Sequence, residues 1–107
     1  MLMPTQREQL MLKVLNAIKQ VFDPEIPVNI WDLGLIYDIQ ITEEAEVVVL
    51  MTLTAPNCPE AEGIPVEVQD RIRMIDEVKD CKVMLTFEPA WDKDRLTEEA
   101  KFTLGLF

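Results

Sequence analysis

The feature that most constrains the fold is an apolar run, Val47 to Leu53, that stops at a segment holding two prolines, Pro56 and Pro59. The β-branched and apolar residues of the run favour a strand. Because proline cannot donate to a strand ladder, the strand must end before Pro56. After Pro59, apolar residues recur at helical spacing at Ala61, Ile64, Val68, Ile72 and Ile75. The segment therefore predicts a buried strand, a turn and a helix.

The other elements follow from the same two periodicities. Thr5 and Glu8 form a capping-box pattern, and the residue before Pro24 is disfavoured in a helix, so the first helix is predicted to end near Asp23. The remaining predicted elements are strands over 35–41, 46–54 and 81–88, a hairpin connection over 42–45, and helices over 65–77 and 97–104. The side chains expected to face the core include Phe22, Leu35, Tyr37, Ile39, Ile41, Val83, Leu85 and Phe87.

This order, α-β-β-α-β-α, predicts a single small α/β (α+β) domain over 1–107, with a mixed three-stranded sheet covered by helices. The hairpin makes the first two strands antiparallel, and the helical crossover makes the second and third parallel. Loops 23–33, 54–59 and 88–92 then meet at one edge of the sheet. The residues expected there are Asp23, Glu25, Asp32, Thr54, Cys58, Glu88 and Trp91.

The second cysteine, Cys81, begins the third strand and is therefore expected at the opposite end of the sheet from Cys58. At about 3.3 Å per strand residue, the two thiols are separated by roughly 20 Å. A disulfide needs Cα atoms within about 7 Å, so we expect neither a disulfide between them nor a metal ion shared by both thiols of one chain.

Charge and hydropathy exclude several classes of partner. The net charge is −10, from 20 acidic and 10 basic residues spread along the chain, and no basic stripe is present to neutralise phosphates. Nucleic acid is therefore not an expected partner. No apolar run is long enough to span a bilayer and no signal-peptide pattern is present, so we expect a cytoplasmic protein without a membrane partner. In that compartment both cysteines are expected to be reduced.

Cys58 is the candidate functional residue. It falls at a strand-to-helix junction, where the positive end of the helix dipole favours the thiolate that attacks electrophiles and binds soft metals. Glu60 and Glu62 oppose thiolate formation, so a small hydrophobe packed under the turn is an equal alternative. The chain has no histidine, which leaves too few ligands for a closed zinc site and no imidazole base for cysteine catalysis.

Three blocks resemble the signature of the SufT/PaaD-like family of iron–sulfur cluster assembly factors. They are Asp-Pro-Glu-Ile-Pro-Val-Asn-Ile-Trp-Asp-Leu-Gly-Leu-Ile (23–36), Thr-Leu-Thr-Ala-Pro-Asn-Cys-Pro (52–59) and Phe-Glu-Pro-Ala-Trp (87–91). The resemblance implies a small α/β fold like the N-terminal domain of Mrp-type cluster carriers. It places the family's reactive cysteine on Cys58, its motif acids on Asp23 and Glu25, and its motif threonine on Thr54. The family's Pro-x-Trp corner corresponds to residues 89–91. This chain has Glu at 88 and Ala at 90, where members of the family frequently have Asp and a second Pro.

The resemblance implies a maturation factor, not an enzyme, that assists cluster assembly or transfer to client proteins. Cys58 would be its metal ligand or a persulfide-like acceptor, and a transient iron–sulfur cluster its only cofactor. Because clusters commonly take four cysteines, a partner thiol, glutathione or a bridging homodimer must complete the ligand set. The expected partners are the assembly machinery and client apoproteins, and family members serve either general maturation or one oxygenase. An adaptor without a cluster remains an alternative, and a thiol enzyme is a weaker one.

Each supporting residue also has a structural interpretation. Asp23 and Glu25 flank Pro24, where acids are ordinary loop and cap formers, although they are also suited to bind hard metals or protein partners. Thr54 is placed to hydrogen-bond the turn. Trp91 is expected to cover the core, since large aromatic side chains usually fill space.

Overall fold

The computed structural model describes residues 3–23, 27–54 and 63–103. The elements are α1 (Pro4–Ile18), β1 (Ile36–Ile41), β2 (Glu46–Met51), α2 (Gly63–Arg73), β3 (Asp80–Leu85), a 3-10 helix η2 (Lys93–Arg95) and α3 (Glu98–Thr103). The predicted α-β-β-α-β-α order is confirmed, with the 3-10 helix added before α3. No helix within the described ranges is both long and apolar enough to cross a membrane.

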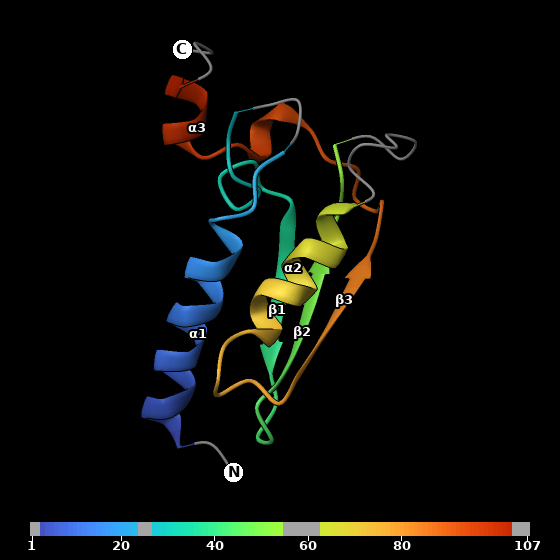
Figure 1. Ribbon diagram of the computed structural model, residues 1–107. Coiled ribbons are helices and arrows are strands. Elements are labelled where there is room, and N and C mark those ends of the chain that lie inside the picture. Colours follow the sequence, from blue (N-terminus) through green and yellow to red (C-terminus); the bar gives the residue numbers. More distant parts are fainter. Residues whose placement is uncertain (1–2, 24–26, 55–62, 104–107) are drawn as a thin grey trace.

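The sheet has the order β1-β2-β3, with β1 antiparallel to β2 and β2 parallel to β3, as predicted (Figure 1). Met51, the last residue of β2, lies opposite Ile36 and Leu85. The ladder continues one step further, because the Thr52 N–H donates to the Leu35 carbonyl and the Thr86 N–H to the Met51 carbonyl, both at 2.9 Å. The start of β1 and the ends of β2 and β3 therefore share one edge of the sheet.

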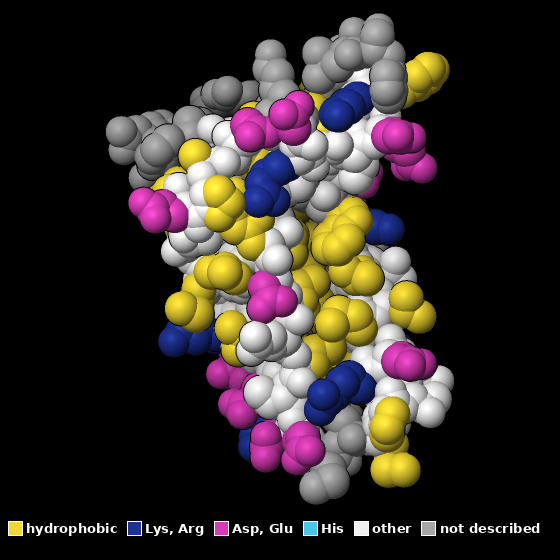
Figure 2. All heavy atoms as spheres, turned by 180° about the vertical axis from the view of Figure 1, so that it is seen from behind, with side chains coloured by type: hydrophobic (Ala, Val, Ile, Leu, Met, Phe, Trp, Pro, Cys, Tyr) yellow, Lys and Arg dark blue, Asp and Glu magenta, His cyan; other side chains and the backbone are white. Residues whose placement is uncertain are grey.

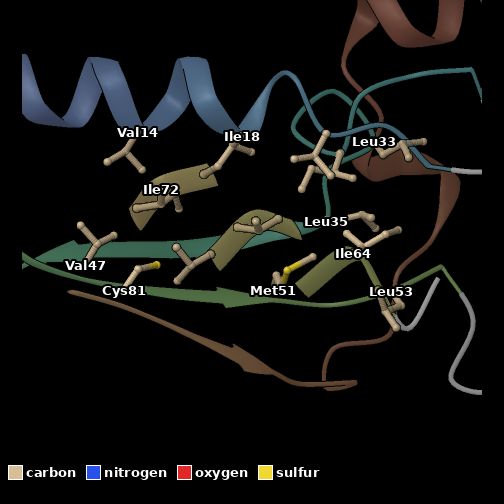
Figure 3. Packing of buried hydrophobic residues seen from close by; sticks show 14 of the residues in the cluster. Val14, Ile18, Leu33, Leu35, Val47, Met51, Leu53, Ile64, Ile72 and Cys81 are labelled. Carbon is tan, nitrogen blue, oxygen red and sulfur yellow. The ribbon is translucent and has the colours of Figure 1, made fainter. Parts of the chain in front are cut away.

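The core lies between the sheet and the two longer helices (Figure 3). Apolar residues repeat every four positions on both helices, so each helix presents one apolar stripe to the core. The buried residues of this layer are Leu10, Val14 and Ile18 of α1, Ile64, Val68 and Ile72 of α2, and Val47, Val49 and Met51 of β2. Burial of a Val, Leu or Ile side chain stabilises the fold by about 1.5–3 kcal/mol.

Several predicted helix boundaries are wrong. Helix α1 begins at Pro4, and the Met3 N–H donates to Gln6 Oε1 at 2.9 Å, so the cap lies two residues before the predicted Thr5–Glu8 box. It ends at Ile18. Phe22 lies beyond it in a short antiparallel bridge with Asn29 and is 55% exposed rather than in the core. Helix α2 begins before Pro65, because the first turn of a helix tolerates proline, whose missing N–H has no partner there.

Three residues predicted to face the core, in or next to the sheet, do not do so. The register of β1 shifts between Ile36 and Asp38, so Tyr37 is the extra residue of a bulge and leaves the face shared by Ile36 and Ile39. At the other edge, Leu85 and Phe87 are 46% and 38% exposed. Strand β3 ends at Leu85 because the chain then turns, as the Glu88 N–H bonds to Thr86 Oγ1 at 3.2 Å.

Candidate functional site

The loop that carries Asp23 is fastened at its base by a two-stranded clip. The Ile30 N–H donates to the Val21 carbonyl at 2.9 Å, and the Asp23 N–H donates to the Val28 carbonyl at 3.3 Å. Asp23 is only 8% exposed, in contrast to most acidic side chains in a chain of net charge −10. Charged residues are seldom buried unless they have a partner. Asp23 is therefore built into the fold at the base of this loop.

The turn before β1 is fixed by an Asn–Asp pair. Asn29 Oδ1 accepts from the Asp32 N–H and Asn29 Nδ2 donates to Asp32 Oδ2, both at 2.9 Å. Asparagine and aspartate commonly stabilise turns in this way. Asp32, expected at the shared edge, thus has a structural role there, holding the main chain that leads to Gly34.

The segment after β3 crosses back over this turn. Trp91 Nε1 donates to the Leu33 carbonyl at 2.5 Å, and the Thr97 N–H donates to the Asp32 carbonyl at 2.9 Å. The contact is close at Gly34, whose φ is +77° and where an added Cβ would lie 2.3 Å from the Arg95 carbonyl oxygen. The structure thus brings Trp91 to the turn before β1.

The bulged tyrosine adds a second connection to the same segment. The Tyr37 hydroxyl donates to the Pro89 carbonyl at 2.7 Å, and the Arg95 guanidinium lies 4.1 Å from the centre of the Tyr37 ring. Tyr37 and Arg95 were not among the predicted site residues. The contacts join positions 52 and 58 residues apart in sequence, so no local pattern indicates them.

The candidate thiol lies outside the described residues, as does Glu25. Thr54 is the last described residue before that segment; it is half-buried and follows the fully buried Thr52 and Leu53 at the end of β2. The structure therefore places Asp23, Thr54 and Trp91 on the elements predicted to meet at this edge. It does not test the positions of Cys58 and Glu25.

Cys81 has the properties of a packing residue. It lies opposite Val47 at the hairpin end of the sheet, as predicted, whereas the site edge is at Met51. Its side chain is 1% exposed. Burial raises the pKa of the Cys81 thiol to about 11, with Arg73 opposing the shift and Asp80 adding to it. At neutral pH the thiol is therefore protonated and shielded, which makes it a poor nucleophile and metal ligand.

Metal-binding groups do not cluster in the part of the chain that the structure describes. Within 3–23, 27–54 and 63–103, no three cysteine, aspartate or glutamate side chains lie close enough together to hold an ion. The described residues thus provide a rigid frame around the end of β2 rather than a set of ligands.

Comparison with known proteins gives similarity over most of the chain. Residues 12–85 match the model of a family described as iron–sulfur cluster assembly protein. A Porphyromonas gingivalis protein named Fe-S protein maturation auxiliary factor is 48% identical over 92 residues, covering 86% of this chain and 88% of that protein. The Fe-S protein maturation auxiliary factor SufT of Staphylococcus aureus is 36% identical over 86 residues, covering 80% of this chain and 98% of that protein.

A solved structure agrees with the fold. The crystal structure of a domain of unknown function, DUF59, from Bacillus anthracis superposes with a TM-score of 0.85 at 34% sequence identity. The match covers 94% of this chain and 95% of that one. The similarity therefore extends over nearly the whole length of both chains.

Proposed function

The chain belongs to the iron–sulfur cluster assembly protein family, and from this premise we propose that it is a maturation factor that assists cluster assembly or transfer to client proteins. The resemblance to the SufT/PaaD-like family is confirmed. The observation that carries the proposal is the family match over residues 12–85, which includes Asp23, Thr54 and Cys58 in one alignment.

We propose Cys58 as the functional thiol. The chain has two cysteines, and Cys81 is buried with a pKa of about 11. Cys58 is therefore the cysteine that is proposed to react at neutral pH. Cys58 follows Thr54 by four residues and precedes α2. A thiolate before a helix can serve as a ligand to iron, or it can attack the outer sulfur of a partner's persulfide, whose inner sulfur then leaves as the partner's thiolate.

We propose that the supporting residues hold the segments at the edge of the sheet where β2 ends. Asp23 closes the base of one loop, and Trp91 fastens the segment after β3 to the turn before β1. Thr54 continues the buried end of β2. Glu25 is proposed as a contact to a protein partner, since it lies in the loop whose base the clip fixes. None of these roles requires the residue to bind metal.

The cluster is cargo in this proposal, held transiently. Clusters are commonly bound by four cysteines, and one chain supplies a single available thiol. A thiol of an assembly protein, of a client apoprotein, of glutathione or of a second copy must complete the set. The partners are therefore proteins of the assembly pathway, in the cytoplasm, and no enzymatic reaction is assigned to the chain.

An adaptor that joins assembly proteins without binding a cluster is the second candidate. The family match supports it equally, because the match indicates a role among assembly proteins without assigning a cluster to this chain. A thiol enzyme has less support, because nucleophilic cysteine catalysis normally uses a nearby base and the chain contains no histidine.

Anaerobic reconstitution with ferrous iron, sulfide and glutathione, which supplies the missing thiol ligands, tests the thiol assignment. Wild type, Cys58→Ser and the matched control Cys81→Ala are compared by visible absorption and bound iron, after circular dichroism has shown that all three are folded. We expect Cys58→Ser to lose the bound cluster and Cys81→Ala to retain it. Equal cluster binding by wild type and Cys58→Ser rules out Cys58 as a cluster ligand.

A further inference from the structure

A cavity of about 280 Å³ lies between α1 and β1, at the outer edge of the sheet. Its lining is almost entirely apolar: Met11 and Leu15 of α1, Trp31, and Ile36, Tyr37, Asp38 and Ile39 of β1. Figure 2 shows that hydrophobic side chains gather in a hollowed band on the face behind the view in Figure 1. We refer to this cavity as the α1–β1 groove.

The strand that borders the groove has an unpaired outer side. β1 is the first strand of the order β1-β2-β3, and among the described residues only β2 pairs with it. The Thr42 N–H donates to the Glu46 carbonyl at 2.9 Å, so the backbone groups of every second residue before Thr42 face β2. The N–H and carbonyl groups of Ile39 and Ile41 therefore face outward, next to the groove.

The walls of the groove are held in place by contacts outside it. The hydroxyl of Tyr37 bonds to the Pro89 carbonyl at 2.7 Å and its ring is covered by Arg95. The carbonyl of Trp31 accepts from the Gly34 N–H at 3.0 Å. A preformed cleft loses little conformational entropy when it is filled, which favours binding.

An edge strand beside an apolar cleft is suited to an extended peptide. The peptide backbone pairs with the strand, while alternate side chains enter the cleft, a mode known as β-augmentation. The charges specify the peptide further. Asp38 is exposed on the rim, and the chain carries a net charge of −10, so a basic segment is attracted. A second copy would bring another Asp38 and another charge of −10 to the same edge.

We propose that the α1–β1 groove binds an extended segment of another protein, apolar at alternate positions and carrying Lys or Arg, as a fourth strand beside β1. Ile39 and Ile41 supply the backbone pairing, the cleft takes one apolar side chain, and Asp38 receives the basic one. Binding of this peptide requires neither a cluster nor the maturation role.

The test uses the full-length protein and a fluorescein-labelled peptide, Lys-Val-Thr-Leu-Thr-Val-Arg, measured by fluorescence polarisation. One matched peptide has Glu in place of Lys and Arg, and another is N-methylated at alternate residues so that it cannot pair with a strand. We expect the basic peptide to bind the protein with a Kd below about 1 mM. Charge reversal should weaken binding about two- to fivefold, and N-methylation at least about tenfold.

Protein variants locate the binding. Asp38→Lys should reverse the preference between the basic and acidic peptides, whereas Asp70→Lys, the same charge change on the exposed side of α2, should not. Amide NMR shifts on titration should map to residues 36–41 and to α1. The proposal is overturned if the basic peptide does not bind below about 1 mM, or if N-methylation leaves its affinity unchanged. It is also overturned if sedimentation shows a dimer that Asp38→Lys dissociates, since the occupant is then a second copy.

Discussion

The two cysteines should differ sharply in reactivity towards an alkylating agent. Cys81 is 1% exposed and its pKa is raised from 9.0 to about 11. The thiolate is the reacting form, and its fraction at neutral pH falls tenfold for each unit of pKa. The shift therefore lowers the thiolate fraction of Cys81 about a hundredfold relative to an ordinary cysteine, before shielding by the core is counted.

Limited alkylation with iodoacetamide at pH 7, followed by peptide mass mapping, measures the contrast. We expect Cys58 to be labelled at least about a hundred times faster than Cys81 in the folded protein. In concentrated urea the two rates should become similar, which controls for the local sequence. Equal labelling in the folded protein, or faster labelling of Cys81, would show that Cys58 is a packing residue and would remove the physical support for a thiol mechanism.

Three further predictions concern stability. Trp91→Phe removes the hydrogen bond to the Leu33 carbonyl and should lower the free energy of unfolding by about 0.5–1.5 kcal/mol in urea titrations; an unchanged midpoint would show that this contact contributes nothing. Gly34→Ala should cost more than about 1 kcal/mol, because φ is +77° and the new Cβ would meet the Arg95 carbonyl oxygen, and a neutral effect would contradict that close approach. Because the pKa of Cys81 is raised in the folded state, the protonated thiol contributes to the free energy of unfolding. This contribution is fully present below pH 9 and is lost as the pH rises towards 11. Unfolding curves from pH 8 to 11 should therefore converge for wild type and Cys81→Ala, and a constant difference between them would argue against the shift.

The topology could be predicted because it follows from local periodicity and connection length. The change from strand to helical spacing after Pro59 and the short connection over 42–45 leave few arrangements open. Boundaries were less predictable where two patterns overlapped. Thr5 and Glu8 have the residue types of a capping box, whereas Met3 is not a typical cap, and Pro4 at the first helical position is the signal for the earlier start. The apolar spacing continues to Phe22, although the helix has already ended at Ile18.

The bulge in β1 was not predictable from alternation alone. A single extra residue shifts every later side chain to the other face of the sheet. The type of residue at Tyr37 gives no signal, because tyrosine is compatible with either face. The frame of the site was partly predictable. Strand directions place Asp23, Thr54 and Trp91 on elements at one edge, but the bonds of Trp91 to Leu33 and of Tyr37 to Pro89 join distant segments and have no local signature.

We propose that the chain matures iron–sulfur proteins through Cys58. The most direct measurement is the activity of iron–sulfur enzymes in cells that lack the endogenous protein and express wild type, Cys58→Ser or Cys81→Ala at equal levels. We expect Cys81→Ala to restore the activity as wild type does, and folded Cys58→Ser not to restore it. If Cys58→Ser restores client activity as well as wild type, the thiol-based role is wrong, and the chain acts as an adaptor between assembly proteins.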